Sequence, residues 1–563
     1  MKLRRLEIES FRGIRELDVV LGDTTVLIGE NNSGKTSVLD ALRFALRAVS
    51  SRRGCVFDAY DFHLPHANAE PASSPAISIR LTFREDAAGD WDENQLARLN
   101  RAQILQLDED GRAAVALKVS AQYDPASREF TQGYEFQNLA GSPLVSVPGS
   151  AMAILHEEIS YYYLAALRDA ARQFDARGPF WRPFLQESQL TPDRRQEIEQ
   201  KLSEVNQLII SSHASFSQVV SSLEQVQHVV AMTGGDKAVS IDAVPARLFE
   251  MLSKAEVNLN AVTGAKIPIE RHGEGTQSLA VLTLFSAYLQ AWNKGDAIVA
   301  LEEPEAHLHP SAVRALWKLI EGIPGQKIIS THSGDLLSVV PCNAVIRLHR
   351  APAKTMAYRF QDARLEPRDL RKFEYHIRRA RGELLFSRCW ILGEGETEGT
   401  LIPECARILG NDLEQAGIRF VPYGHVSLAT YLKIANSLGI QWVVLADNDQ
   451  QGANDHRAVR QHLEGRTEKD VLYTMPQANI EQYLCCNGFE NTYAALLDNQ
   501  SRQRVIAQPG EASYPTQVAN ALPAKKKVFA AQAVLEEIRN KGKPMPPLLA
   551  SVIEASLKQA TQI

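Results

Sequence analysis

Hydrophobic residues recur with a period of two at the start of the chain. Leu6 and Ile8 alternate with polar residues, and Leu17, Val19 and Leu21 do the same. This alternation is typical of strands that bury one face. The first segment is therefore predicted to form a pair of strands.

A strand, a turn and a helix are expected next. The apolar run 24–28 predicts the strand, and an amphipathic helix is predicted over 37–49 after a glycine-containing turn. Residues 51–77 are rich in Pro, His, Ala and Ser, which predicts a loop. Strands are predicted again over 76–83 and 113–123.

Helical periodicity then dominates from Ile154 to Leu259. Within this region the segment 193–230 is amphipathic and nearly without Gly and Pro. Such a segment packs either as a dimer interface or as a buried helical insertion, and the pattern leaves both open.

A parallel-sheet pattern fills the rest of the chain. The apolar runs 297–303 and 327–330 end in polar residues, as buried central strands do. Residues 340–385 are mixed and predict a connector. Strands then alternate with helices, which predicts a doubly wound sheet with ligands at the carboxyl ends of its strands. These later strands are expected at 390–394, 418–424, 441–449 and 471–476.

Length and charge narrow the functional classes. A chain of 563 residues exceeds one hydrophobic core, so an α/β multidomain protein is expected. The 61 basic and 67 acidic side chains give a net charge of −6, which excludes a polycationic nucleic-acid coat. Contact with DNA would then need local basic patches.

The cysteines and the N-terminus point to the cytoplasm. None of the six cysteines forms a pair with zinc-ligand spacing, and Cys485 and Cys486 are adjacent, so a reducing compartment is expected. The N-terminal segment alternates charged and apolar residues, unlike a signal peptide. No apolar run approaches the roughly 20 residues of a membrane helix, so no membrane contact is expected.

Residues 29–36, GENNSGKT, match the phosphate-binding loop between a strand and a helix. Gly29 and Gly34 let backbone N–H groups surround phosphates. Lys35 is expected to neutralise the β and γ oxygens of ATP, and the Thr36 hydroxyl to ligate Mg²⁺. The expected nucleotide contacts are completed by Asn31, Asn32 and Ser37.

Two acids follow the apolar run 297–301. Glu302 is expected to orient the Mg²⁺ shell, and Glu303 to polarise the attacking water. His332 ends the next strand and is expected at the γ-phosphate. A glutamate pair after a strand is by itself more often merely solvated.

The segment 271–278, RHGEGTQS, precedes an apolar helix. Such a loop can direct the positive end of a helix dipole toward a phosphate, through Gly273, Gly275 and Gln277. A simple helix N-cap explains the segment equally well when it is taken alone.

These elements and their order resemble ABC ATPases of the SMC and recombination-repair type. The resemblance implies that 271–278 is a signature loop, which acts across a dimer interface in that class. Glu302 departs from the pattern, because many relatives carry Asp there.

Acidic residues also follow two later strands. Glu394 and Glu398 lie in GEGETE after the first, and Asp447 and Asp449 lie in DND after the second. Carboxyl ends of parallel strands meet at one edge, and clustered carboxylates need a cation. Oxygen ligands suit Mg²⁺ or Mn²⁺, and two such ions can clamp a phosphodiester. The alternative is a solvated helix start and an unrelated turn.

The Glu-Gly turn followed by Asp-x-Asp resembles a Toprim domain. The resemblance implies that Glu394 is a general base or metal ligand, and that Asp447 and Asp449 hold metal with help from Glu398. Glu396 has no assigned role.

Two residues further along are candidates for the same site. Glu481 either completes the metal shell or is an ordinary acid at a helix start. Lys527 is favoured as the cation that stabilises charge on the scissile phosphate. Its competitors are Lys541 and Lys543.

An ABC ATPase followed by a Toprim domain resembles the OLD (overcoming lysogenization defect) family of nucleases, which includes the nuclease subunit of the Gabija anti-phage system. The segments LEEPEAHLHP, STHS and GELLFSRCWILGEGETE carry the resemblance, together with Tyr163 and the 166–169 run ALRD. It implies cytoplasmic, metal-dependent DNA cleavage by a homodimer or larger assembly, often in phage defence with a partner protein. The expected domains are an ABC part over 1–165 and 259–350, a helical dimerisation insert over 166–258, a connector over 351–386 and a Toprim domain over 387–563.

Three functions are consistent with these motifs. The first is a nucleotide-regulated, divalent-metal-dependent DNA endonuclease. The second is an SMC-like DNA-clamping ATPase without cleavage activity. A topoisomerase- or primase-like Toprim enzyme ranks lower, because no separate tyrosine-bearing or template-binding module is evident. The basic segment 376–381 is a candidate DNA contact, although a solvated helix face explains it at least as well.

Overall fold

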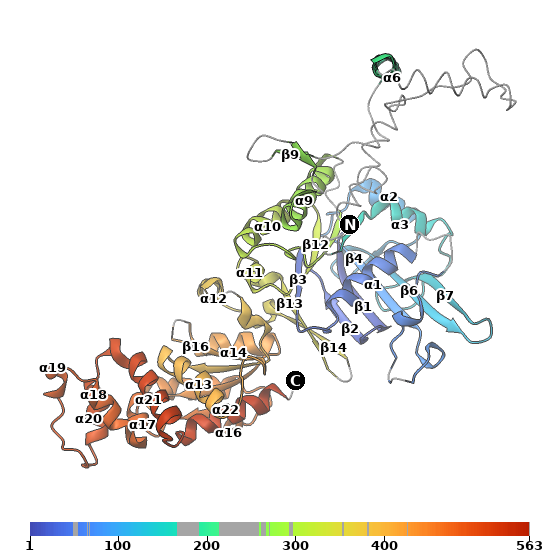
Figure 1. Cartoon of the computed structure of the whole chain (residues 1–563). Helices are drawn as coiled ribbons and strands as arrows, with labels where there is room; N and C mark the ends of the chain where they lie inside the picture. The colour runs from blue at the N-terminus through green and yellow to red at the C-terminus, as the bar shows by residue number, and fades with distance from the viewer. Residues whose placement is uncertain are drawn as a thin grey trace, which may run out of the picture. The chain divides into compact units, whose positions relative to one another are not determined.

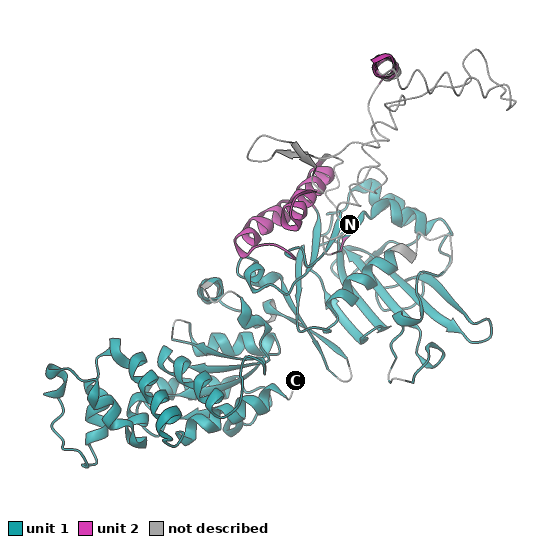
Figure 2. Cartoon of the chain, in the orientation of Figure 1, with its two compact units in different colours: residues 1–163, 296–305, 325–563 teal, residues 164–295, 306–324 magenta. Residues whose placement is uncertain are grey.

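The structure is a computed structural model (Figure 1). It describes residues 1–48, 55–64, 66, 68–165, 191–212, 258–260, 266–268, 271–291, 297–351, 354–379, 382–424 and 426–561. The chain divides into two compact units (Figure 2). The first comprises Met1–Tyr163, Asp296–Glu305 and Gly325–Ile563, and the second comprises Leu164–Gly295 and Ala306–Pro324.

An antiparallel sheet opens the first unit. Its strand order is β2-β1-β4-β6-β5, and β7 also pairs with β6. The predicted initial strand pair is confirmed, since Ile8 lies opposite Leu17. The strands are β1 (Leu3–Phe11), β2 (Ile14–Val20), β4 (Ile77–Arg84), β5 (Gln106–Leu107), β6 (Ala113–Asp124) and β7 (Glu129–Gln137).

A second sheet holds the predicted buried strands. Its order is β14-β13-β3-β12-β11-β8, and the neighbours β11, β12, β3 and β13 are parallel. Strand β14 is antiparallel to β13 at one edge. The strands are β3 (Thr24–Ile28), β8 (Tyr161–Leu164), β11 (Ile298–Glu302), β12 (Gln326–Ser330), β13 (Val345–Arg350) and β14 (Thr355–Arg359).

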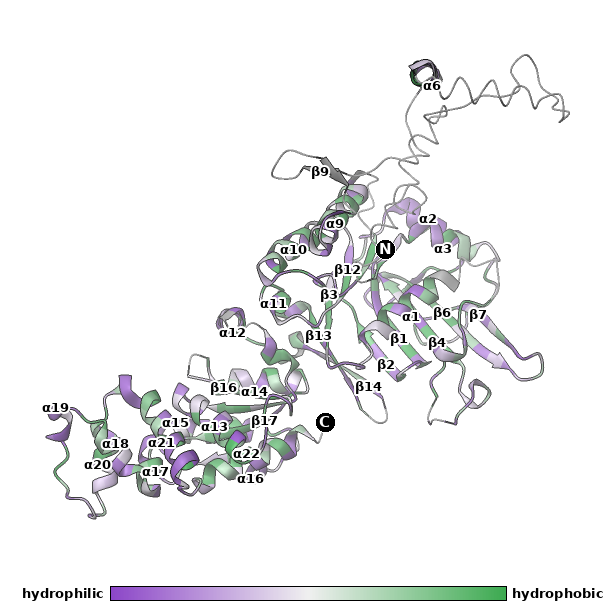
Figure 3. Cartoon of the chain, in the orientation of Figure 1, coloured by the Kyte–Doolittle hydropathy of each residue, from purple (hydrophilic) through white to green (hydrophobic). Residues whose placement is uncertain are grey.

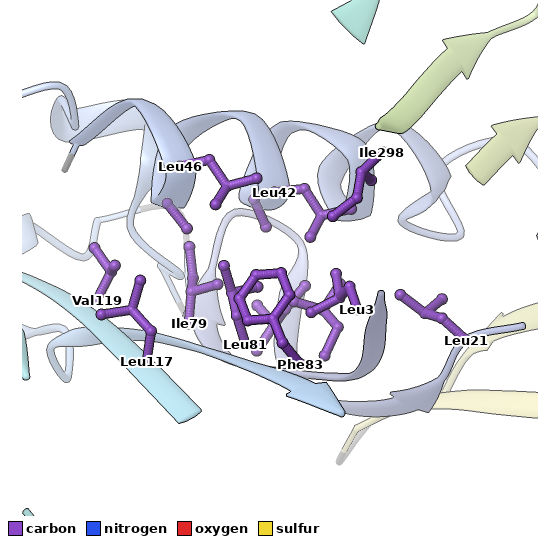
Figure 4. Close-up of a cluster of buried hydrophobic side chains, with 14 of the residues drawn as sticks. Leu3, Leu21, Leu42, Leu46, Ile79, Leu81, Phe83, Leu117, Val119 and Ile298 are labelled. Carbon is purple, nitrogen blue, oxygen red and sulfur yellow. The ribbon is translucent and has the colours of Figure 1, made fainter. Parts of the chain in front are cut away.

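Helix α1 (Lys35–Ala48) packs into a core shared by these two sheets. Its apolar residues Leu42 and Leu46 face Ile79 and Leu81 of the antiparallel sheet (Figure 4). Ile298 of the parallel sheet belongs to the same cluster. Burial of a large aliphatic side chain contributes about 1.5–3 kcal/mol, so this core fixes the helix that follows the phosphate-binding loop.

A third, fully parallel sheet carries the acidic motifs. Its order is β16-β15-β17-β18, with the predicted strand-helix alternation. Alternate residues of β15 face opposite sides. Ile391 packs in the core that includes α13, α21 and α22, whereas Trp390 meets Tyr431 of α14. The strands are β15 (Cys389–Gly393), β16 (Ile418–Pro422), β17 (Gln441–Ala446) and β18 (Leu472–Thr474).

The first unit also contains a set of helices, and Figure 3 colours the chain from hydrophilic (purple) to hydrophobic (green). They are α2 (Glu93–Arg101), α3 (Ala151–Glu158), α11 (Gly334–Leu337), α12 (Pro367–Arg379), α13 (Glu396–Ile408), α14 (Leu428–Ser437), α15 (Gln450–Gln461), α16 (Glu468–Val471), α17 (Ile480–Leu484), α18 (Glu490–Ala495), α19 (Asn499–Arg502), α20 (Tyr514–Ala521), α21 (Lys527–Lys541) and α22 (Pro547–Ala560).

The second unit is described through a few elements. Helices α9 and α10 pack against each other, and β9 and β10 form a small antiparallel pair. The helices are α6 (Pro192–Ser212), α9 (Glu274–Ala291) and α10 (Pro310–Gly322), and the strands are β9 (Asn258–Asn260) and β10 (Lys266–Pro268). No described helix is long and apolar enough to cross a membrane.

Two predicted helical regions agree only in part with the described structure. The helical region predicted from Ile154 contains β8, because Tyr161–Leu164 pairs at the edge of the second sheet. The predicted helix over 193–230 is confirmed as far as Ser212, and its remainder lies outside the described residues.

A buried guanidinium joins the second and third sheets. Arg347 of β13 is 1% exposed. It donates hydrogen bonds to the backbone oxygens of Leu438 (2.9 Å), Gly439 (3.1 Å) and Ser387 (3.2 Å). Burial lowers the Arg347 pKa to about 10, and the three acceptors compensate for the loss of water.

Candidate functional site

The phosphate-binding loop is built at the end of β3. Gly29 has φ +148°, and a Cβ there would lie 2.3 Å from the backbone oxygen of Leu348, so only glycine fits. Gly34 also has a positive φ, +102°. Asn31 and Asn32 are exposed, and Ser37 lies in the first turn of α1.

Lys35 occupies the centre of this loop. Its Nζ donates hydrogen bonds to the backbone oxygens of Gly29 and Glu30, both at 2.8 Å. Burial lowers the Lys35 pKa to about 8, although the charges of Glu303 and Glu30 act in the opposite direction. A bound triphosphate would give this ammonium group negatively charged partners in place of neutral backbone oxygens.

Glu302 lies where β11 ends, and two side chains orient its carboxylate. The Thr36 hydroxyl donates to Oε1 at 2.8 Å, and the Tyr163 hydroxyl donates to Oε2 at 2.6 Å. The residues expected to share the Mg²⁺ shell, Thr36 and Glu302, are therefore in direct contact. Motif reasoning did not assign the role of Tyr163 in this arrangement.

Glu303 and His332 also lie together. His332 Nε2 is 3.6 Å from Glu303 Oε1. The His332 pKa is lowered by burial and by the charge of Lys35, which places this ring in the same electrostatic environment as the phosphate-binding loop. Glu305, which sequence reasoning missed, accepts hydrogen bonds from Thr331 Oγ1 (2.5 Å) and the His332 N–H (3.2 Å).

The 271–278 loop belongs to the second unit. Gly273 and Gly275 lie at the start of α9, and Gln277 donates to the backbone oxygen of His272 at 2.7 Å. A Cβ on Gly275 would lie 3.1 Å from the His307 backbone oxygen, so this loop packs closely against the segment that precedes α10. Its role at a nucleotide stays a prediction.

The acidic residues of the third sheet lie at the ends of adjacent parallel strands. Leu392 of β15 is opposite Val444 of β17, so Glu394 and Asp447 leave the sheet at the same edge. The close turn after Asp447 requires glycine, because a Cβ on Gly452 would lie 1.9 Å from the Asp447 backbone oxygen.

Asp449 and Glu398 flank this edge. Asp449 caps α15 by accepting the Gly452 N–H at 2.9 Å. Glu398 lies on α13 and is 4% exposed. Glu396, the acid without an assigned role, is exposed.

The carboxyl groups of this edge act on one another. Burial, together with the charges of Glu398, Glu394, Asp449 and Glu481, raises the Asp447 pKa to about 8. Burial, together with the charges of Glu481 and Glu394, raises the Glu398 pKa to about 7. The five candidate metal ligands therefore form one electrostatic cluster.

The cluster fits a divalent cation by its chemistry. Asp447 Oδ1 is buried and has no hydrogen-bond partner among the described residues. All five candidate ligands offer the carboxylate oxygens that Mg²⁺ and Mn²⁺ prefer. In the described chain, no three His, Cys, Asp or Glu side chains are already arranged as a ligand set, so binding would need side-chain adjustment.

Glu481 and Lys527 meet beside this cluster. Lys527 Nζ, at the start of α21, is 3.1 Å from Glu481 Oε1. Glu481 is 4% exposed. The competing Lys541 and Lys543 instead pair with Glu537, at 3.0 and 2.7 Å.

Sequence reasoning missed Asp455. This residue of α15 is 2% exposed and accepts hydrogen bonds from the Tyr423 hydroxyl (2.7 Å) and Gln451 (3.0 Å). Burial and then Asp449 and Asp455 raise the Glu394 pKa, so Asp455 belongs to the surroundings of the same site. No motif in the sequence marks Asp455.

An ion pair joins the phosphate-binding loop to the strand that leads to Glu394. Arg388 directly precedes β15 and donates to both carboxylate oxygens of Glu30, at 2.5 and 2.7 Å. The Arg388 guanidinium lowers the Glu30 pKa. Neither motif predicted this contact.

Family models match nearly four fifths of the chain. The model described as "Protein of unknown function (DUF2813)" matches residues 1–383. The model described as "Overcoming lysogenization defect protein-like, TOPRIM domain" matches residues 385–449. The second match contains Glu394, Glu398, Asp447 and Asp449.

Three curated proteins are similar over most of their length. The "Uncharacterized protein YbjD" of Escherichia coli (strain K12) is 30% identical over 88% of this chain and 88% of its own. The "OLD nuclease" of Thermus scotoductus is 23% identical over 83% of this chain and 87% of its own. The "Endonuclease GajA" of Bacillus cereus is 23% identical over 82% of this chain and 78% of its own.

Proposed function

We infer, because the chain belongs to the DUF2813 family and carries an OLD-like Toprim domain, that it is a nucleotide-regulated, divalent-metal-dependent DNA endonuclease. The observation that carries the proposal is the electrostatic cluster at the ends of β15 and β17, with the partnerless Asp447 Oδ1. A buried carboxyl cluster costs stability unless it holds a cation, and such perturbed groups concentrate at functional sites.

The metal ligands would be Glu394, Glu398, Asp447, Asp449 and Glu481. When bound there, Mg²⁺ or Mn²⁺ would polarise the phosphodiester and lower the pKa of water. Glu394 would accept the proton of the attacking water, and burial raises its pKa in the direction that favours this role. Lys527 leaves Glu481 to stabilise the negative charge that develops on the phosphate.

The nucleotide site would hold ATP with Mg²⁺. Lys35 exchanges its backbone acceptors for phosphate oxygens, and Thr36 and Glu302 orient the metal shell. Glu303 orients the attacking water, with His332 at the γ-phosphate. Gly273, Gly275 and Gln277 of a second copy complete the site, so the active form is a homodimer or a larger assembly.

The biological setting follows from the relatives. Proteins with the printed names OLD nuclease and endonuclease GajA match most of this chain. We place the protein in the bacterial cytoplasm, where it acts on DNA in anti-phage defence, with or without a partner protein, or in DNA processing.

A DNA-clamping ATPase without cleavage activity is the second candidate. It is favoured by one observation: Thr36 and Glu302 of the nucleotide site are already in contact, whereas no three described acids form a ready metal-ligand set. Its central expectation is DNA retention that depends on ATP while the DNA stays intact.

Supercoiled plasmid distinguishes these functions. The purified chain is incubated with plasmid and Mg²⁺ or Mn²⁺, with EDTA as control, and with or without ATP. Nicked or linear product that disappears in EDTA supports the endonuclease. Intact plasmid under all conditions contradicts it, and relaxed topoisomers would indicate a topoisomerase-like enzyme.

Tyr163→Phe should slow ATP hydrolysis by about fivefold. The substitution removes one hydrogen bond to the Glu302 carboxylate, worth roughly 1 kcal/mol, while Thr36 still holds the other oxygen. Steady-state phosphate release measures the rate, and ATP affinity should stay within twofold. Tyr161→Phe is the matched control, because the Tyr161 hydroxyl is buried with no hydrogen-bond partner in the described part of the chain.

Mg²⁺ should raise the melting temperature more at pH 8 than at pH 6. The pKa values of Asp447 (about 8) and Glu398 (about 7) exceed those of the unfolded chain. Between pH 6 and pH 8 the metal-free folded protein therefore binds protons that the unfolded chain has lost. Its free energy of unfolding falls as the pH rises through this range. A bound cation offsets the fall.

Differential scanning fluorimetry in EDTA and in Mg²⁺ measures this effect. In a domain of about 150–250 residues, a change of about 1 kcal/mol in the free energy of unfolding shifts the melting temperature by roughly 2–4 °C. Asp447→Asn should reduce the difference between the two pH values. An identical Mg²⁺ shift at both pH values in the parent protein would refute the electrostatic account.

A further inference from the structure

Helix α12 presents a basic face to solvent. Its side chains Phe373 and Ile377 are buried, which fixes the opposite side as the outer one. Residues three and four apart share a helix face. The exposed residues of α12 with this spacing are Arg368, Arg371, Lys372, Tyr375 and Arg378.

The four cations of this basic face stand without acidic partners. None of them makes an ion pair or a side-chain hydrogen bond with any residue that the structure describes. Some other exposed arginines of the unit are paired, as Arg98 is with Glu158 and Arg460 with Glu468. The acids at helical spacing from these cations, Asp369 and Glu374, form no ion pair with them in the described chain, so the cations stay available to a ligand.

Acidic groups of α12 border this face, since Asp369 precedes Lys372 by three residues and Glu374 precedes Arg378 by four. Asp369 and Glu374 are half-buried, whereas Glu366 is exposed just before the helix begins. The charges of Glu374 and Arg378 act in opposite directions on the pKa of buried Cys342, since Glu374 raises it and Arg378 lowers it. The electrostatic potential on the solvent side of this basic face is therefore positive.

The basic face leads to the candidate nuclease site. Lys372 lines a cavity of about 630 Å³ together with Glu394. Tyr423, Gln451, Asn454 and Asp455 also line it. A nucleotide fits within a cavity of this size, and its walls offer amide and hydroxyl groups for hydrogen bonds.

We propose that the basic face of α12 binds the sugar-phosphate backbone of a DNA strand and that Lys372 directs this strand into the cavity beside Glu394. The inference rests on the proposed function, whose substrate path it specifies. Arg368 and Arg378 are ten residues apart, about 15 Å along the helix, which spans about four phosphates of one strand. Tyr375 is 63% exposed and offers a ring for stacking an unpaired base.

Binding of labelled DNA to the full chain tests this inference. Fluorescence anisotropy is measured in EDTA, so that cutting does not interfere, with a single-stranded 30-mer and the matching duplex over a series of salt concentrations. In Arg371→Gln/Lys372→Gln/Arg378→Gln, affinity for the single strand should fall at least tenfold. The slope of log K against log salt should decrease in magnitude by about 2, since each lost phosphate contact contributes about 0.7.

A matched variant controls for the loss of charge. Lys469→Gln/Arg502→Gln/Arg504→Gln removes three exposed cations from other parts of the same unit and should bind as the parent does. Tyr375→Ala should weaken single-strand binding more than duplex binding. Because the substituted side chains are exposed, all variants should keep the parental melting temperature.

The outcomes separate this inference from the proposed function. Parental affinity and salt slope in the α12 variant, an equal loss in the control, or no DNA binding by the parent protein would overturn the inference. Loss of binding in the α12 variant alone supports it even if the parent leaves plasmid uncut, a result that would contradict only the endonuclease function.

Discussion

Asp447→Asn should reduce metal-dependent cutting of plasmid by about 10²–10⁴-fold. Asp447 lies at the centre of the acidic cluster, where four other carboxylates raise its pKa and one of its oxygens has no partner in the described chain. The amide keeps the shape but removes the charge that would hold a divalent cation. The expected loss is comparable to that of a positioned catalytic group.

Glu394→Gln should have a similar effect, because Glu394 leaves the neighbouring strand at the same edge. Initial rates of nicking in Mg²⁺ and in Mn²⁺ measure both variants. ATP binding should stay unchanged, which distinguishes loss of the site from loss of the fold. Both variants should also be more stable to heat in EDTA, because each relieves repulsion among buried carboxylates.

Asp412→Asn serves as the control for this pair. Asp412 is an exposed acid of the same sheet region that accepts the N–H groups of Glu414 and Gln415, a role that asparagine can keep. It should cut at the parental rate. Rates near the parental value in both Asp447→Asn and Glu394→Gln would remove the basis of the metal-site assignment.

Lys35→Ala should weaken ATP binding by about 10–150-fold. A hydrogen bond to a charged group contributes about 1.5–3 kcal/mol, which corresponds to this range of affinity. In the structure the ammonium group is held by the backbone oxygens of Gly29 and Glu30, and burial lowers its pKa to about 8. Phosphate oxygens would replace these neutral acceptors with charged ones.

Isothermal titration calorimetry with a non-hydrolysable ATP analogue measures the Lys35 effect. Lys118→Ala is the matched control, since Lys118 lies on β6, away from the phosphate-binding loop, and forms an ion pair with Glu135 at 3.7 Å. Cutting by Lys35→Ala in the absence of nucleotide should equal that of the parent. Parental ATP affinity in Lys35→Ala would refute the phosphate-binding role of the loop.

The elements with strong local patterns could be predicted from sequence. The alternation around Ile8 and Leu17 and the apolar runs of β11, β12, β15 and β17 correspond to observed strands. Strand-end placement also predicted that Glu394 and Asp447 would leave one sheet edge, since parallel neighbours share their direction. These features depend on short-range periodicity, which a single sequence displays.

Features that depend on distant partners could not be predicted in this way. Tyr161–Leu164 forms an edge strand because of pairing within the second sheet, and its local pattern resembles the helices around it. The Tyr163 bond to Glu302 and the Glu30 pair with Arg388 join residues 139 and 358 positions apart. Asp455 has no motif, and only burial beside Tyr423 reveals it.

The contacts of Arg347 have a consequence for how relatives of this protein can diverge. Its guanidinium holds main-chain oxygens of residues 387, 438 and 439, so it depends on the path of the backbone there. The side chains at 387 and 438 are buried, so packing constrains them even though Arg347 does not contact them, and Gly439 is fixed because it has φ +63° and a Cβ would lie 2.5 Å from the Tyr358 ring. Exchange of the segment that follows Ser387 between relatives should therefore succeed only where the arginine, this glycine and the Glu30–Arg388 pair are kept together.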